Sequence, residues 1–346
     1  MDKTTRILII TLGSLSIIII LALVSATTST TGINSSTNTF ITNNSSSIAI
    51  PSNTSFSSSH TNSTPTPNVA AAAISSNQPK IKVVASFYPM YEFVKQVGGD
   101  RVDVSTLIPI GIEPHDYDPT IQQILNAQSA SMLVFNSPGL ETWVPKVNAK
   151  FALDASNGIT LRSSTDPNSH GTDPHVWLDP ILTKKEVENI RDGLIKVDPV
   201  NAAYYAATAK KFTGQLDSLD TSIRTMLPTC QKKDFIAFHE AFGYFAKRYG
   251  LNQHSVLGIS PEGEIAPQKL QEVVQLARDL GINTIYSEDL VDPRLANTIA
   301  QEIPNGKVVI LSPIEGINRS EQKAGITYID KMHQDIAALK GGLVCK

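Results

Sequence analysis

Cysteine is nearly absent from this chain of 346 residues, with Cys230 and Cys345 as its two thiols. Two thiols are too few for a framework of disulfides or for a zinc site of four thiolates. They share no motif spacing, so one disulfide and two free thiols are both compatible with the sequence. An excess of one charge is also lacking, because the net charge is -3. The chain therefore offers no strongly basic surface, and we expect no nucleic-acid partner.

The N-terminus lacks charged residues over one long stretch. Lys3 and Arg6 precede an uncharged apolar run at residues 7–24, which is about long enough to cross a bilayer. Basic residues before the run and none directly after it place the N-terminus inside and the remainder outside. The small residues at 25–28 include no cysteine for a bacterial lipoprotein anchor. We predict a signal or anchor helix at residues 1–25, with an uncleaved anchor preferred over secretion after cleavage.

Residues 26–79 lack a periodic apolar pattern and are rich in Ser, Thr and Asn. Such a segment cannot bury enough surface to offset chain entropy, so we predict a disordered stalk. Several N-x-[ST] sequons predict a glycoprotein if the chain is exported, although this composition also produces sequons by chance. These sequons begin at Asn34, Asn43, Asn44, Asn53 and Asn62.

From residue 80 onward, short apolar runs typical of buried parallel strands alternate with amphipathic segments. Strands are expected at 82–85, 102–108, 132–135, 235–238, 255–259, 284–286 and 308–311, with helices at 91–99, 119–130, 241–249, 267–280, 294–303 and 321–339. The longest helical pattern runs from 198 to 226. We predict an α/β fold in which two lobes with mostly parallel sheets, residues 80–197 and 229–346, are joined by one long helix at 198–228.

Three of the seven histidines stand where strands are expected to end. His115 lies in a proline-bounded loop, His175 precedes the apolar residues Val-Trp-Leu, and His239 follows the strand at 235–238. Glu288 follows the strand at 284–286. Ligands gather beyond the carboxyl ends of parallel strands, so these four side chains form a candidate site.

Each of these residues also has a simpler interpretation. A loop histidine can be solvated, and a buried histidine can form its hydrogen bonds with the backbone. Near Glu288, the acidic residues Asp289 and Asp292 can cap a helix. Together, three imidazoles and one carboxylate make a tetrahedral set suited to Zn²⁺, whereas Mn²⁺ prefers more oxygen ligands. His60, His254 and His333 are assigned to the surface. His170 is the single histidine of the polar segment 163–172, so a histidine-rich collecting loop is absent.

At these residues the chain resembles the substrate-binding proteins of zinc and manganese ABC importers, of the high-affinity zinc-uptake type (cluster A-I), over residues 80–339. The resemblance is carried by Ala-Ser-Phe-Tyr-Pro at 85–89, Glu-Pro-His-Asp-Tyr-Asp-Pro at 113–119, Asp-Pro-His-Val-Trp-Leu-Asp-Pro at 173–180, Phe-His-Glu-Ala-Phe-Gly-Tyr-Phe at 238–245 and Tyr-Ser-Glu at 286–288. It implies two α/β lobes with metal in the cleft between them.

The resemblance also implies a ligand set. His115, His175 and His239 match the three family histidines, and manganese receptors usually carry glutamate where His239 stands. Some members of the family use an aspartate late in the second lobe as the fourth ligand, and the corresponding position in this chain is Ser312. The resemblance then favours Glu288 as the fourth ligand, with Asp292 or water as alternatives.

The function implied is that of a zinc-binding receptor on the extracellular face of the membrane, or in a periplasm-like space. We expect it to deliver Zn²⁺ to the membrane permease of an ABC importer, to be a monomer and not to be an enzyme. Three alternatives remain: a manganese receptor of the same class, a surface adhesin, and a zinc metallohydrolase with Glu240 as base. No HExxH motif supports the hydrolase.

Overall fold

The computed structural model describes residues 79–137, 139–164, 171–263 and 265–346. These residues belong to one compact unit, Ala72–Lys346. The predicted anchor at residues 1–25 and nearly all of the predicted stalk lie outside the described residues. Among the helices of the described part, none is long and apolar enough to cross a membrane.

The first lobe is built on a parallel sheet with strand order β2-β1-β3-β4. Its strands are β1 (Ile81–Ala85), β2 (Val102–Thr106), β3 (Met132–Phe135) and β4 (Ala152–Asp154), accompanied by the helices α1 (Tyr88–Gly98), α2 (Ile121–Ser129) and α3 (Val144–Val147). All four residues of β3 are buried. A central strand covered on both faces is expected to be continuously apolar, as Met-Leu-Val-Phe is.

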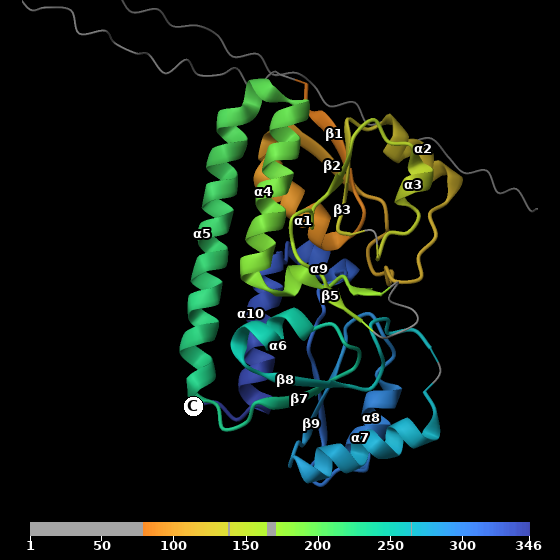
Figure 1. Ribbon diagram of the computed structural model, residues 1–346, viewed down its shortest axis with the longest axis vertical. Coiled ribbons are helices and arrows are strands. Elements are labelled where there is room, and N and C mark those ends of the chain that lie inside the picture. The colour runs from red at the N-terminus through yellow and green to blue at the C-terminus, as the bar shows by residue number, and fades with distance from the viewer. Residues whose placement is uncertain (1–78, 138, 165–170, 264) are drawn as a thin grey trace, which may run out of the picture. The chain divides into compact units, whose positions relative to one another are not determined.

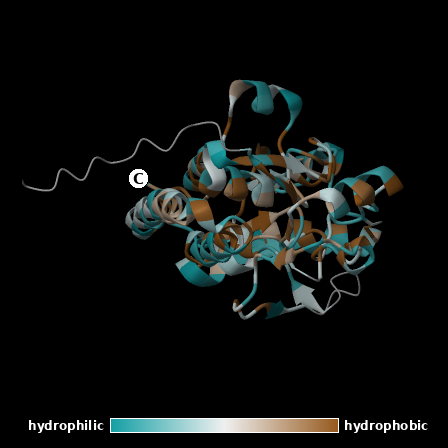
Figure 2. Cartoon of the chain, turned by 90° about the horizontal axis from the view of Figure 1, so that it is seen from above, coloured by the Kyte–Doolittle hydropathy of each residue, from teal (hydrophilic) through white to brown (hydrophobic). Residues whose placement is uncertain are grey.

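The second lobe repeats this plan. Its parallel sheet has the order β10-β9-β7-β8, made of β7 (Asp234–Ala237), β8 (Asn252–Ser255), β9 (Thr284–Ser287) and β10 (Lys307–Ile310). The helices between them are α6 (Gly243–Tyr249), α7 (Pro267–Asp279) and α8 (Arg294–Gln301). In both sheets the first strand of the lobe lies between its second and third. Figure 2 shows hydrophobic segments toward the middle of the molecule and hydrophilic residues on the outer turns of its helices.

Two long helices, α4 (Pro180–Val197) and α5 (Ala202–Met226), pack side by side (Figure 1). The sequence analysis predicted α5 but not α4. The signals for α4 were present, because Asp179 caps its N-terminus through the N–H groups of Ile181 and Leu182 and Pro180 occupies its first turn. Buried α5 residues recur at helical spacing at Tyr205, Ala209, Phe212, Leu216, Leu219 and Ile223. The expected fold of two α/β lobes with a long connecting helix is confirmed.

Hydrogen bonds also tie the two lobes together outside this helix. The Trp177 indole Nε1 donates to the Pro313 carbonyl at 2.7 Å, and the Tyr328 hydroxyl donates to the Trp177 carbonyl at 2.6 Å. The Tyr88 hydroxyl donates to the Ile326 carbonyl at 3.1 Å. These partners are 136, 151 and 238 residues apart in the chain. The lobes are therefore joined on several sides.

The end of the chain differs from the prediction in two ways. A single helix at 321–339 was expected, but the structure has α9 (Arg319–Ala324) and α10 (Tyr328–Gly342). Gly325, with φ 71°, ends α9 in the left-handed conformation that favours glycine. Cys230 and Cys345, whose state the sequence left open, form a disulfide that fastens the C-terminus to the end of the α5 connection.

Candidate metal centre

The ends of the parallel strands bring the candidate residues together. In the second lobe, His239 follows β7 and Glu288 follows β9, which are adjacent strands on either side of the point where strand order reverses. In the first lobe, His115 lies in the loop between β2 and α2. His175 comes directly after the short hairpin of β5 (Arg162–Ser163) and β6 (Thr172–Asp173) and caps the 3-10 helix η3 (Val176–Leu178).

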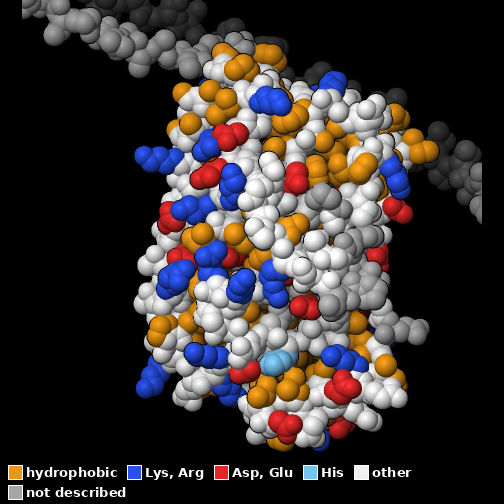
Figure 3. All heavy atoms as spheres, viewed as in Figure 1, with side chains coloured by type: hydrophobic (Ala, Val, Ile, Leu, Met, Phe, Trp, Pro, Cys, Tyr) orange, Lys and Arg blue, Asp and Glu red, His pale blue; other side chains and the backbone are white. Residues whose placement is uncertain are grey.

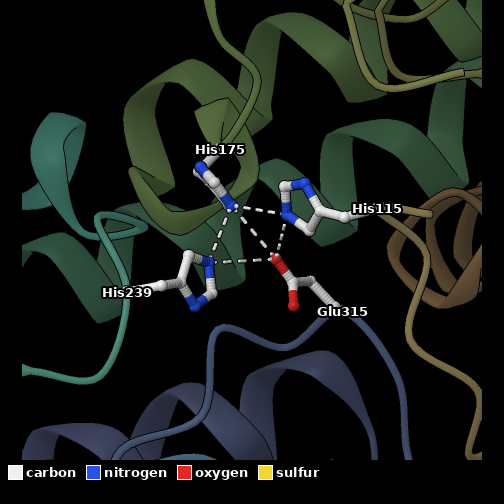
Figure 4. A group of neighbouring side chains, drawn as sticks. All are labelled: His115, His175, His239 and Glu315. Atoms are coloured by element: carbon white, nitrogen blue, oxygen red, sulfur yellow. Dashed lines mark hydrogen bonds and ion pairs between the residues drawn. The ribbon is translucent and has the colours of Figure 1, made fainter. Parts of the chain in front are cut away.

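Four side chains point toward one another (Figure 4): His115, His175 and His239, with Glu315 from the loop that follows β10. We call them the His3Glu group. The Nε2 atom of His175 lies 3.2 Å from Nε2 of His115 and 3.1 Å from Nε2 of His239. Glu315 Oε1 lies 3.0 Å from Nε2 of His115 and of His175, and 3.5 Å from Nε2 of His239. One atom from each residue therefore faces a common centre.

The spacing of these atoms fits a tetrahedral cation. With Zn–N and Zn–O distances near 2.0–2.1 Å, the edges of a regular tetrahedron are about 3.3–3.4 Å long. The separations of 3.0–3.5 Å lie close to this value. In addition, Glu315 Oε2 is buried and has no hydrogen-bond partner among the described residues. Nitrogen and carboxylate donors in this arrangement suit Zn²⁺ better than a cation that requires mainly oxygen.

Two carboxylates fix the orientation of two of the imidazoles. Asp173 Oδ1 lies 2.9 Å from His175 Nδ1, and Glu288 Oε1 lies 2.5 Å from His239 Nδ1. When Nδ1 carries the proton and donates it to the carboxylate, the lone pair of Nε2 is free to face the centre. Such acceptors set the tautomer of a metal-binding histidine and raise its basicity.

The loop after β10 positions Glu315. The Ser312 hydroxyl donates to the Asp289 carboxylate at 3.0 Å, and the Ser312 N–H donates to Asp335 Oδ1 at 2.8 Å. Next to Glu315, the buried Ile314 has φ 57°, a left-handed conformation that a β-branched residue rarely adopts. This turn directs Glu315 toward the three histidines. Backbone strain of this kind persists only where surrounding contacts enforce it.

Burial and charge shift the pKa values of the group in opposite directions. Burial lowers the pKa of His115, and the charge of Glu315 offsets this only in part. Burial also disfavours protonated His175 and His239, but their carboxylate partners outweigh it, so both pKa values lie above the usual value. The Glu315 carboxyl is opposed by burial yet held ionised by His239 and His115, which places its pKa well below the usual range. His175 and His239 therefore favour their protonated forms, and Glu315 favours its ionised form.

A cavity of about 290 Å³ adjoins the group, and Glu315 is part of its wall. Its lining includes the partly exposed Tyr91 and the exposed Ile112, as well as the buried Phe87. Gly316 and Gln322 of the second lobe also line the cavity, so residues of both lobes form its wall.

Comparison with known families identifies the class of protein. Residues 83–342 match the family described as the periplasmic component A of the zinc-uptake complex. The chain belongs to this family. The match takes in both lobes and every member of the His3Glu group.

Individual members of the zinc-uptake family are also similar to the chain. The high-affinity zinc uptake system protein ZnuA of Bacillus subtilis is 40% identical over 284 residues, which cover 77% of this chain and 89% of that protein. The zinc-binding protein AdcA of Streptococcus pyogenes is 34% identical, but the matched region covers 75% of this chain and only 56% of AdcA. The Zn(II)-bound ZnuA-like domain of Streptococcus pneumoniae AdcA aligns with a TM-score of 0.68 at 35% identity, covering 77% of this chain and 99% of that one.

The fourth position of the group differs from the sequence expectation. The structure brings His115, His175 and His239 together as expected, but Glu315 takes the place assigned to Glu288. Glu288 contacts the Nδ1 atom of His239, on the side of the ring that faces away from the centre of the group. It follows β9 too closely to reach the centre, whereas the loop after β10 extends further. The same rule of strand ends, applied to β10, was the available signal for Glu315.

Other residues considered from the sequence lie away from the centre. Asp292 is exposed and pairs with Arg294, and Ser312 anchors its loop to Asp289. The carboxylate of Glu240, the candidate base of a hydrolase, is 43% exposed and faces Arg162 at 3.9 Å. His254 pairs with Asp234, while His333 is exposed. His60 and His170 lie outside the described residues.

Proposed function

We propose that this chain is the extracytoplasmic zinc receptor of an ABC-type importer, with His115, His175, His239 and Glu315 as the ligands of its zinc cargo. The observation that carries this proposal is the convergence of one atom each from His115, His175, His239 and Glu315, contributed by both lobes, all within 4.8 Å of one another. Family membership supports the same function. The site predicted with Glu288 is thereby revised in its fourth ligand.

Delivery to a permease requires the receptor to stay at the membrane. We propose that the apolar run at residues 7–24 holds it there and that residues 26–79 act as a spacer. We also propose that the receptor works as a monomer. Lysines and arginines lie among aspartates and glutamates on the face seen in Figure 3, so the receptor presents no broad field of one charge on that side. The partner we propose is the membrane permease, and the cargo is the zinc ion.

Manganese and hydrolysis are less well supported. A histidine at position 239 adds a nitrogen where Mn²⁺ would favour oxygen. Catalytic zinc sites keep one position open for water, whereas the His3Glu group offers four protein ligands. Glu240, the base that a hydrolase would need, faces solvent and Arg162. We therefore propose a binding protein without enzymatic turnover.

Metal content is the direct test of this proposal. The purified region 79–346 is stripped with a chelator, offered equal concentrations of Zn²⁺ and Mn²⁺, and analysed for bound metal. We expect one zinc per chain and little manganese. Retention of manganese in preference to zinc, or no retained metal, would contradict the proposed cargo.

Zinc is also expected to stabilise the folded chain. A ligand that binds only the folded state raises the unfolding free energy by about 2.7 kcal/mol at a hundredfold excess over Kd. For a chain of this size the melting temperature should rise by roughly 5–10 °C. Hydrogen exchange should slow around His115, His175, His239 and Glu315, with little change along α5. Protection confined to one lobe would argue against a metal shared by both.

The affinity for zinc is expected to fall as the pH falls. Zinc binds neutral imidazoles, so each proton that His175 or His239 holds must leave first. Because the pKa values of both are raised, competition begins above the usual histidine value of about 6.5 and grows toward acid pH. We expect the affinity to fall steadily as the pH falls through the titration range of these imidazoles, by up to about tenfold per pH unit for each proton displaced. Competition titrations across this range measure it, and a flat profile would exclude imidazole ligands.

A further inference from the structure

Arg162 lies on the opposite side of Asp173 from the histidine that Asp173 supports. The two residues are paired across the β5–β6 hairpin, and Arg162 Nη1 lies 3.5 Å from Asp173 Oδ2. Both atoms are buried, and neither has a hydrogen-bond partner among the described residues, so this ion pair is their closest polar contact there. An ion pair that is shielded from water is screened little by salt.

The other carboxylate oxygen of Asp173, Oδ1, contacts His175. It accepts hydrogen bonds from the His175 backbone N–H at 3.0 Å and from the His175 ring Nδ1 at 2.9 Å. The carboxylate is therefore held at both oxygens, by the guanidinium on one side and by the imidazole on the other. Its rotation would break one of these contacts. Arg162 thus influences the direction in which His175 points without touching it.

Arg162 also reaches into the second lobe, at the segment that follows His239. Its Nη2 lies 3.9 Å from Glu240 Oε1, and its guanidinium carbon lies 5.6 Å from the centre of the Tyr244 ring. The Tyr244 hydroxyl accepts from the Arg162 N–H and donates to the Asp173 carbonyl, both at 2.7 Å. A Cβ atom on Gly243 would lie 1.4 Å from Arg162 Nη1, so the position of the guanidinium requires glycine there.

We propose that Arg162 is a positioning residue for zinc binding, which locks the loop of His175 to the loop of His239 through Asp173, Tyr244 and the surface of Gly243. This inference rests on the proposed zinc-binding function. These contacts hold His175 of the first lobe and His239 of the second lobe in a fixed position relative to each other. Ligands that are already ordered lose less conformational entropy when the ion binds. The structure assigns to Arg162 a role in retaining the ion, so its loss should act mainly on the rate at which zinc leaves.

The first test compares two arginines that each form an ion pair with an aspartate of the first lobe, Arg162 with Asp173 and Arg248 with Asp179. Arg162→Gln removes the pair that leads to His175, while Arg248→Gln removes the ion pair of Arg248 with Asp179, which leads to the cap of α4. We expect Arg162→Gln to weaken zinc binding about tenfold, the lower end of the range for residues outside the ligand shell, through faster release to a chelator. Arg248→Gln should leave the release rate within about twofold of the original.

A second variant approaches the same contact from the other lobe. Gly243→Ala leaves the charge of Arg162 intact, and alanine is well tolerated at the start of helix α6, but its methyl group displaces the guanidinium. It should reproduce the faster release of Arg162→Gln, and the double variant should be no worse than either single one. Arg162→Lys should recover part of the loss, because it restores the charge beside Asp173 without the planar fork.

A double-mutant cycle separates positioning from general stability. If Arg162 acts through the carboxylate, Arg162→Gln should have little further effect on zinc release once Asp173→Asn is present. Equal release rates for Arg162→Gln and the original protein, or fully additive effects in the Asp173→Asn background, would overturn the inference. Failure of the original protein to bind zinc would instead reject the proposed function, so the two failures are distinguishable.

Discussion

Replacement of His175 by alanine is expected to abolish useful zinc binding, with affinity falling about a thousandfold. The Nε2 atom of His175 lies within 3.2 Å of His115 Nε2, His239 Nε2 and Glu315 Oε1. The His175 side chain is fully buried. Structural zinc sites bind with apparent free energies of about 10–16 kcal/mol, or roughly 3–4 kcal/mol for each of four ligands. A loss of this size corresponds to about two to three powers of ten in affinity.

Competition with a zinc chelator of known affinity measures this change. The matched control is His333→Ala, which removes an exposed histidine from α10. The control variant should bind zinc as the original protein does, and its melting temperature should respond to zinc equally. If both variants lost affinity to the same extent, the His3Glu group would not be the zinc site.

The second large effect concerns the carboxylates. Glu315→Ala is expected to lower the affinity about a hundredfold, because it removes a charged donor from the centre of the group. Glu288→Ala should cost about tenfold, because Glu288 contacts His239 Nδ1 and not the centre. The reverse order, with Glu288→Ala the more damaging, would restore Glu288 as the ligand and contradict our assignment of Glu315.

A spectroscopic comparison makes the same distinction independently of affinity. Co²⁺ in place of zinc absorbs visible light with an intensity that depends on the number and geometry of its ligands. Glu315→Ala should change this spectrum strongly, since water would replace a carboxylate in the ligand shell. Glu288→Ala should leave its form nearly unchanged, since the same four donor atoms remain.

The sequence predicted most of the fold because the signals involved are local. Buried parallel strands appear as short apolar runs, as at 132–135 and 235–238, and glycines such as Gly250 and Gly281 mark the ends of segments. Helix α4 was not predicted, although Asp179 and Pro180 carry the local signals of its start. The split of the last helix depended on the left-handed conformation of Gly325.

The three histidines of the site were predictable from the sequence, whereas Glu315 was not. His239 and Glu288 follow their strands closely, and the sequence placed both beside the cleft. Glu315 is reached through a longer loop whose course depends on Ser312, Asp289 and Asp335, which are distant in sequence. Its final turn uses a left-handed isoleucine, which local preference argues against. Such a turn follows from tertiary packing alone.

The hydrogen bonds that join the lobes beyond α5 have a consequence for how long a captured ion stays. Trp177 holds the carbonyl of Pro313, two residues before Glu315, and Tyr328 holds Trp177 in turn. Thermal opening of the cleft must break these buried bonds together, so the residence time of the ion depends on a rare collective fluctuation. Rapid unloading then requires an input of free energy from outside the receptor.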